Sequence, residues 1–204
     1  MTLTGNARHR RRAERADGVV GNERLTAMTG AVLLVLFAAE GVTILRLHEL
    51  LTVHFFLGML LLGPVALKVA STGYRFVRYY AGSAPYVRKG PPAWPMRLLG
   101  PMVMATSLGV IGTGVMLAAV GPGNGQWLFL HKATFVLWFG VMTIHILVYA
   151  PRLPRLLLGG PPGGRAAAAL AGRGTRWLLL AAALACGLVI AMATLHLAAP
   201  WRAV

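Results

Sequence analysis

Five long apolar runs are the feature of this sequence that most restricts its fold. They cover residues 25–45, 52–70, 98–120, 127–150 and 177–197. Each approaches the roughly 20 residues that a helix needs to cross a hydrocarbon core about 30 Å thick. With 57% hydrophobic and 12% charged residues, the chain is too apolar for an ordinary soluble domain. The sequence therefore predicts an all-α integral membrane protein. For the first run, a retained signal anchor is favoured over a cleaved signal peptide, because the run and the tail before it are both long.

The positive charge is distributed unevenly between these runs. All but three of the 20 Lys and Arg residues lie in the N-terminal tail, around the second-to-third connection, or in the fourth-to-fifth connection; the exceptions are Arg46, Lys132 and Arg202. Because cytoplasmic connections accumulate Lys and Arg, this asymmetry predicts a cytoplasmic N-terminus in a bacterial inner membrane. Membrane topology thus accounts for the net charge of +15. The sequence has no basic motif with interleaved aromatic residues, so it gives no sign of nucleic-acid binding.

The runs and their connections divide the chain into four segments. A basic cytoplasmic tail (1–24) precedes a four-helix core (25–150), a basic linker rich in Gly and Pro (151–176), and a fifth helix with an outer C-terminus (177–204). The sequence GGPPGG at 159–164 predicts a flexible connection between the core and the fifth helix. We expect the second helix to end at 71–73, and the aromatic and arginine residues of 74–80 to lie among lipid headgroups.

Three histidines within the apolar runs are the strongest functional signal. His131 and His145 are fourteen residues apart, so in a helix they share one face and lie about 21 Å apart along the axis. His54 begins the second run, which crosses the membrane in the same direction, and therefore lies at the depth of His131. Two imidazoles facing each other from separate helices are an axial ligand pair for haem iron. Gly58, one turn after His54, removes bulk that would obstruct a flat macrocycle.

In the inner half of the membrane, the candidate metal site lacks a second histidine ligand. His145 is a candidate ligand there, but no second histidine lies at its depth. Lys68 follows His54 by fourteen residues and so shares its face; binding to a haem propionate or a lipid headgroup is favoured over ligation of iron. Trp138 lies midway between His131 and His145, where it either fills the space between two cofactors or packs in the core.

Two further polar groups lie near the outer surface. Glu40 interrupts the first run, and it either pairs with Arg46 or relays protons. His48 is a solvated loop residue, or an alternative outer ligand to His54.

Together these residues resemble the bacterial transmembrane dihaem cytochrome b superfamily, which includes the gamma subunit of formate dehydrogenase and the cytochrome b of nickel–iron hydrogenases. The resemblance covers residues 25–150. It rests on the His131–His145 spacing, on HFFLG at 54–58, and on TGVML at 113–117 in the third helix. It implies four helices holding two b haems. The family also has a histidine near the inner start of the first helix, whereas residues 24–30 contain none. One haem b is therefore expected at the outer site, and a second at the inner site is doubtful.

The expected function is a membrane electron carrier between the quinone pool and a partner redox subunit. No glycine-rich dinucleotide motif follows a strand, so substrate oxidation would occur on the partner rather than on this chain. Two alternatives remain open at this stage. One is a non-catalytic membrane anchor or assembly subunit without haem, and the other is a proton-relay or transport protein that uses Glu40 and the histidines.

Overall fold

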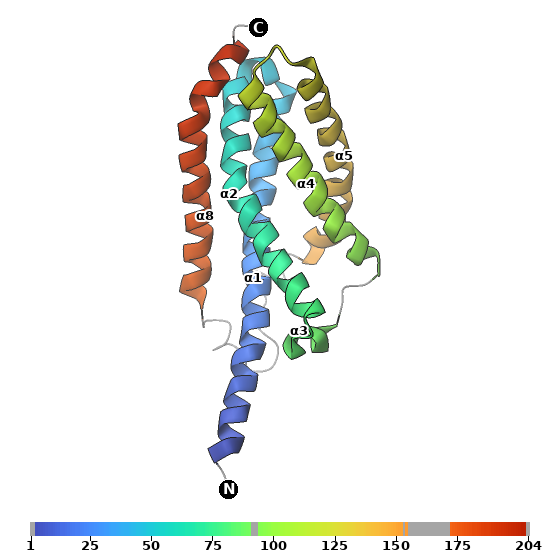
Figure 1. Cartoon of the computed structure of the whole chain (residues 1–204), viewed down its shortest axis with the longest axis vertical. Coiled ribbons are helices and arrows are strands. Elements are labelled where there is room, and N and C mark those ends of the chain that lie inside the picture. Colours follow the sequence, from blue (N-terminus) through green and yellow to red (C-terminus); the bar gives the residue numbers. More distant parts are fainter. Residues whose placement is uncertain (1–2, 91–93, 153, 155–171, 203–204) are drawn as a thin grey trace.

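The computed structural model describes residues 3–90, 94–152, 154 and 172–202, and it is helical without a strand in those residues (Figure 1). The linker sequence at 159–164 lies outside the described residues. Along the chain the elements are α1 (Leu3–Leu45), α2 (Leu47–Tyr80), α3 (Ala84–Lys89), α4 (Trp94–Val120), α5 (Gly125–Tyr149), η1 (Ala150–Arg152), α8 (Arg173–Thr194) and η2 (Leu195–Arg202).

The expected five membrane-spanning segments are confirmed as helices long and apolar enough to cross a bilayer. They are Gly18–Leu45, Leu47–Tyr80, Met96–Val120, Gly125–Tyr149 and Arg173–Arg202. Many of their large apolar side chains are exposed on the outside of the bundle, which is the arrangement that lipid contact requires. The protein is therefore a multi-pass membrane protein.

The expected end of the second helix was wrong. Helix α2 does not stop at 71–73 but continues to Tyr80. Ser71 fits within the helix because its hydroxyl donates to the Lys68 carbonyl at 3.1 Å, while Thr26 and Asn22 of α1 supply further hydrogen-bond partners to it. Helix α1 is likewise longer than the apolar run, because it begins at Leu3.

Two tight connections place the helices antiparallel, as expected. Helix α1 passes into α2 through Arg46, whose backbone departs from helical geometry. Between α4 and α5, Gly121 adopts a φ of 78°, which favours glycine. The Asn124 side chain then accepts a hydrogen bond from the Trp127 backbone N–H at 3.2 Å and caps α5.

The helices form two groups, which Figure 1 shows side by side. Helices α1 and α8 pack extensively against α2, and α4 packs extensively against α5, whereas packing between these two groups is less extensive. The fifth membrane helix, α8, packs closely against α2, because Gly63 and Gly187 bring the two backbones together. The groups meet in apolar clusters; in one, Leu33 of α1 and Leu61 and Val65 of α2 contact Ile111 of α4.

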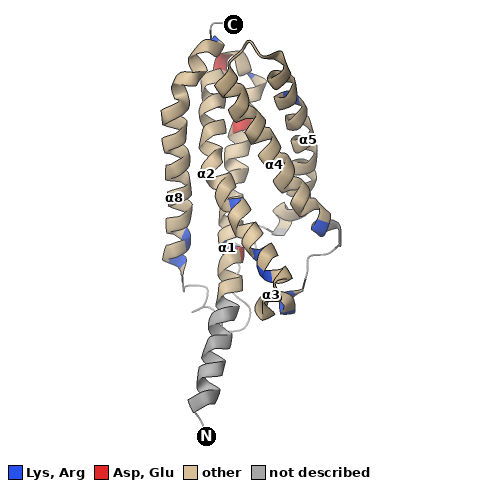
Figure 2. Ribbon diagram, viewed as in Figure 1, with Lys and Arg blue, Asp and Glu red and all other residues tan. Residues whose placement is uncertain are grey.

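The described charges gather at one end of the bundle. Figure 2 shows most Lys and Arg segments toward the end at which α3 and the N-terminal part of α1 lie. The glutamate side chains that the structure describes lie apart: Glu49 is near the opposite end, Glu40 is within the bundle, and Glu23 is beside α3.

Candidate functional site

His54 of α2 and His131 of α5 face each other across the seam between the two helix groups. Their ring centroids lie 6.5 Å apart, and the ring planes make an angle of 71°. The structure therefore brings together the two histidines that the sequence places at one depth on separate helices. Both rings are partly buried.

The environment of His54 favours a proton on one of its two ring nitrogens. Nδ1 lies 3.0 Å from Glu40 Oε1 and 2.9 Å from Thr43 Oγ1. The Thr43 hydroxyl donates its own hydrogen to the Glu40 carbonyl oxygen at 2.5 Å, so toward His54 it can only accept. A proton on Nδ1 would satisfy both contacts and leave the Nε2 lone pair of His54 available.

His131 has the same arrangement with different partners. Its Nδ1 lies 3.2 Å from Thr113 Oγ1 of α4, and that hydroxyl donates to the Gly109 carbonyl at 2.8 Å. A proton on Nδ1 of His131 would likewise satisfy this contact and leave the Nε2 lone pair available. Gly114 makes room for the ring, because a Cβ at that position would lie 3.0 Å from His131 Cε1.

Glu40 lies beside both His54 and Gly58. Glu40 pairs with His54 rather than with Arg46, which lies 3.8 Å from Glu49 instead. This pairing is possible because α1 and α2 are antiparallel neighbours. The last turns of α1, which carry Glu40, therefore lie opposite the first turns of α2, which carry His54. The space beside Gly58 faces the Glu40 carboxylate, with a Cβ position 3.5 Å from Oε1. That separation is an ordinary van der Waals contact, so a Cβ at position 58 would fit beside Glu40.

Lys68 and His145 lie toward the other end of the bundle, but the structure directs Lys68 toward α1. Its Nζ donates to the Thr26 carbonyl at 2.7 Å, and it fills the space above Gly30, where a Cβ would lie only 2.9 Å from Nζ. Nδ1 of His145 is buried and makes no hydrogen bond within the part of the chain described.

Trp138 lies in the core of the bundle between these two levels. Its Nε1 donates to Ser107 Oγ at 3.0 Å, and its ring centroid is 4.8 Å from that of Phe37 on α1. Trp138 therefore packs in the core, which is one of the two roles expected from the sequence, and the hydrogen bond to Ser107 satisfies its one polar atom.

Thr43 and Ser107 were not identified from the sequence as partners of the site. Thr43 could have been found from its position one turn after Glu40 on the same face of α1. Ser107 carries no comparable signal, because only the packing of α4 against α5 brings it to Trp138.

Among the described residues, no group of three or more His, Cys, Asp or Glu side chains is placed to hold a metal ion. The facing pair of imidazoles instead has the composition of an axial ligand set. Comparisons with models of protein families, with curated proteins and with solved structures find no match for this chain.

Proposed function

We propose that this protein is a membrane b-type cytochrome that holds haem between α2 and α5, with His54 and His131 as its axial ligands. The spacing of the two rings carries the proposal. An imidazole nitrogen bonds a metal at about 2.0 Å and lies about 1 Å from its ring centre, so two such ligands of one metal have centroids about 6 Å apart. The observed separation of 6.5 Å is close to that value.

The hydrogen bonds around the two rings also fit axial ligation. A histidine that binds a metal through one nitrogen usually donates the hydrogen of the other nitrogen to a neighbouring acceptor, which fixes the ring's orientation. Glu40 and Thr43 accept from His54, and Thr113 accepts from His131. Haem would supply reversible one-electron chemistry at this position. The chain's own residues supply two oriented nitrogen lone pairs within an apolar bundle.

We propose that the outer pair is the principal haem site. At the inner level, Lys68 bonds to α1 rather than facing His145 with its nitrogen. Its ammonium suits an acidic group, such as a haem propionate or a lipid phosphate. A second haem on His145 would need a further ligand.

The path of the electrons rests on the resemblance to dihaem cytochromes b and on charge. That resemblance implies exchange between the quinone pool and a partner redox subunit. The enrichment of Lys and Arg at the end near α3 favours a cytoplasmic N-terminus in a bacterial inner membrane, which puts the His54–His131 pair in the outer leaflet.

An apolar layer argues against the proton-transport alternative. Along α1 and α2, the Glu40–His54 group and the Lys68–Thr26 group are separated by Leu33, Leu61 and Val65, with Leu36, Phe37, Val69 and Ile111 packed around them. A proton path needs a continuous series of polar groups or waters, and hydrocarbon side chains supply neither. Electron transfer has no such requirement.

A visible spectrum tests the proposal and separates it from a haem-free membrane anchor. Protein purified from cells with ample haem supply should show a Soret band and a reduced α-band. His54→Ala and His131→Ala should each abolish the outer haem signal. His196→Ala is the matched control, because that ring is exposed and contacts the Ala193 carbonyl of its own helix end. A colourless, folded preparation would refute the proposal.

A further inference from the structure

The last turns of α2 and the short helix α3 project beyond the bundle. In Figure 1 they extend past the ends of α4, α5 and α8 on the side where α3 lies. We call residues 74–89 the α2–α3 platform. Its position is independent of whether the protein binds haem.

The depth of the platform follows from contacts at the base of the bundle. The Arg176 guanidinium, near the start of α8, lies beside Gly21, with Nη1 3.4 Å from that residue's Cβ position. The next residue, Asn22, donates to the Ser71 carbonyl at 3.0 Å. Since arginines at helix starts mark the membrane edge, Ser71 lies near that edge on α2. Tyr80 then lies about 13 Å further along the helix, at 1.5 Å per residue, whereas a headgroup layer is only about 5–8 Å thick.

If α2 continues along the membrane normal, this rise would carry the exposed apolar face of its last turns past the headgroups, in contrast to the expectation from sequence that residues 74–80 lie among them. Phe76, Val77 and Tyr80 are 57%, 62% and 69% exposed, and the Phe76 and Tyr80 rings contact each other with centroids 4.5 Å apart. They lie on the side of α2 away from Ser71 and Arg75, which face α1. Exposed aromatic clusters of this kind mark interaction sites.

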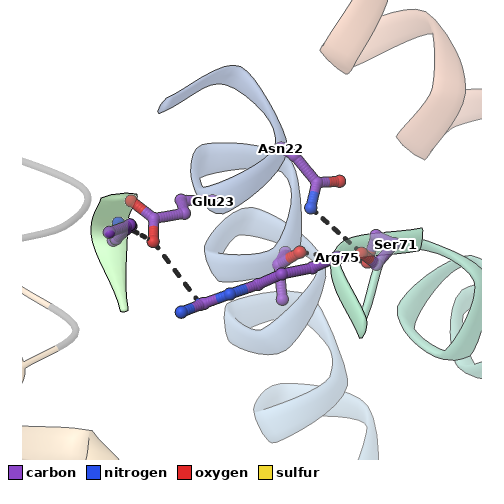
Figure 3. A network of polar contacts seen from close by, with 6 residues as sticks. Asn22, Glu23, Ser71 and Arg75 are labelled. Atoms are coloured by element: carbon purple, nitrogen blue, oxygen red, sulfur yellow. Dashed lines mark hydrogen bonds and ion pairs between the residues drawn. The ribbon is translucent and has the colours of Figure 1, made fainter. Parts of the chain in front are cut away.

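The platform is held rigidly against α1. Figure 3 shows Glu23 of α1 between α2 and α3, where it pairs with Arg75 at 3.5 Å and also with Lys89. Tyr86 of α3 is buried, and its ring lies 6.1 Å from that of Tyr74. A surface fixed in this way loses little conformational freedom when a partner binds.

Charge indicates what kind of partner fits. Residues 74–89 contain Arg75, Arg78, Arg88 and Lys89 and no acidic residue, and Glu23 pairs with only two of these cations. Arg78 and Arg88 are exposed. The N-terminal tail and the linker before α8 are themselves rich in arginine, so charge disfavours either of them as the cover for this surface.

We propose that the α2–α3 platform is a docking surface for a partner protein that presents acidic side chains around an apolar patch. Aromatic and arginine side chains are the residues most enriched where protein interfaces carry their binding energy. Opposite charge would orient the partner and accelerate its encounter. Anionic lipid headgroups are the competing occupant.

Depth measurement distinguishes a protein-docking face from a lipid-inserted one. A spin label at Val77→Cys, in a Cys186→Ser background, is placed in full-length protein in phosphatidylglycerol-containing nanodiscs. A label at Val189→Cys is the control, since Val189 is 67% exposed near the middle of the Arg173–Arg202 span. The label at 77 should be relaxed by an aqueous nickel complex and the label at 189 by oxygen. An oxygen-dominated response at both positions would place the face in lipid and overturn the proposal.

Site-directed photocrosslinking identifies the partner. A photoreactive residue at position 77, in native membranes, should give a discrete protein adduct whose crosslinked peptide is acidic. Arg78→Glu with Arg88→Glu should reduce the adduct about tenfold or more, because like charges at an interface are strongly unfavourable. Arg46→Glu with Arg202→Glu, at the opposite end, should leave it unchanged. Adducts with lipid alone, or a protein adduct insensitive to Arg78 and Arg88, would refute docking at this surface.

Discussion

The contact between α2 and α8 gives a prediction whose size follows from the coordinates. A Cβ on Gly63 would lie 1.9 Å from the Ala183 carbonyl oxygen and 2.9 Å from the Gly187 backbone nitrogen. Ordinary contacts begin at 3.4 Å, so Gly63→Ala requires a retreat of about 1.5 Å between the helices. Both atoms belong to backbone, and neither can rotate out of the way.

We therefore expect a loss near the upper end of the range for overpacked cores, about 3 kcal/mol. The effect should be this large because helix association in lipid depends on close van der Waals packing rather than on a hydrophobic driving force. Gly73→Ala provides a matched control on the same helix, because a Cβ there has no neighbour within 4 Å. That control should be neutral, or should stabilise α2 by up to about 1 kcal/mol through higher helix propensity.

The assay is equilibrium unfolding in mixed micelles with increasing SDS, followed by far-ultraviolet circular dichroism. The free energies of unfolding of the two variants should differ by about 3 kcal/mol or more. If Gly63→Ala proves as stable as Gly73→Ala, then the two backbones do not approach as closely in the folded protein as described. The argument that α8 packs tightly on α2 would then fail.

Three further predictions concern the site and the platform. Gly114→Ala should displace the His131 ring and lower the ratio of haem to protein absorbance. Gly112→Ala should leave that ratio unchanged, because a Cβ at position 112 has no neighbour within 4 Å. Equal ratios in the two variants would contradict the close contact between Gly114 and His131. Ser107→Ala leaves the buried Trp138 Nε1 without an acceptor and should cost about 1–3 kcal/mol in the SDS unfolding assay, and a change under about 0.5 kcal/mol would count as the effect of an ordinary surface substitution. Burial, and secondly the neighbouring Tyr74, raise the pKa of Tyr86 in the folded protein. The contribution of Tyr86 to the free energy of unfolding is therefore fully present below about pH 10, the ordinary tyrosine pKa. It is lost as the pH rises through the higher pKa of the folded state. Tyrosinate absorbance should show that the titration step removed by Tyr86→Phe lies above the ordinary tyrosine pKa of about 10.

Hydropathy and periodicity were sufficient to predict much of the architecture. The apolar runs predicted the five spans, because length and apolar composition are the requirements for crossing a bilayer. Because His54 and His131 lie near the starts of two spans that cross in the same direction, the sequence predicted that they would lie at one depth. The structure confirms that these rings face each other.

Features that depend on packing between helices could not be obtained in this way. The end of α2 was placed too early, because Ser71 looks like a terminator until its partners Asn22 and Thr26 on α1 are known. Glu40 was considered with Arg46, its neighbour in sequence, whereas the antiparallel arrangement of α1 and α2 brings it to His54. Neither partner choice is encoded in local periodicity.

The division of the bundle into two helix groups has a consequence for how the protein is made. His54 enters the membrane with the first hairpin, α1–α2, whereas His131 arrives only when α4 and α5 have been synthesised and inserted. During biogenesis, the first hairpin exposes its imidazole to lipid before the second hairpin docks. A large planar ligand could therefore reach the site laterally from the bilayer during that interval, without having to pass between the helices of the assembled bundle.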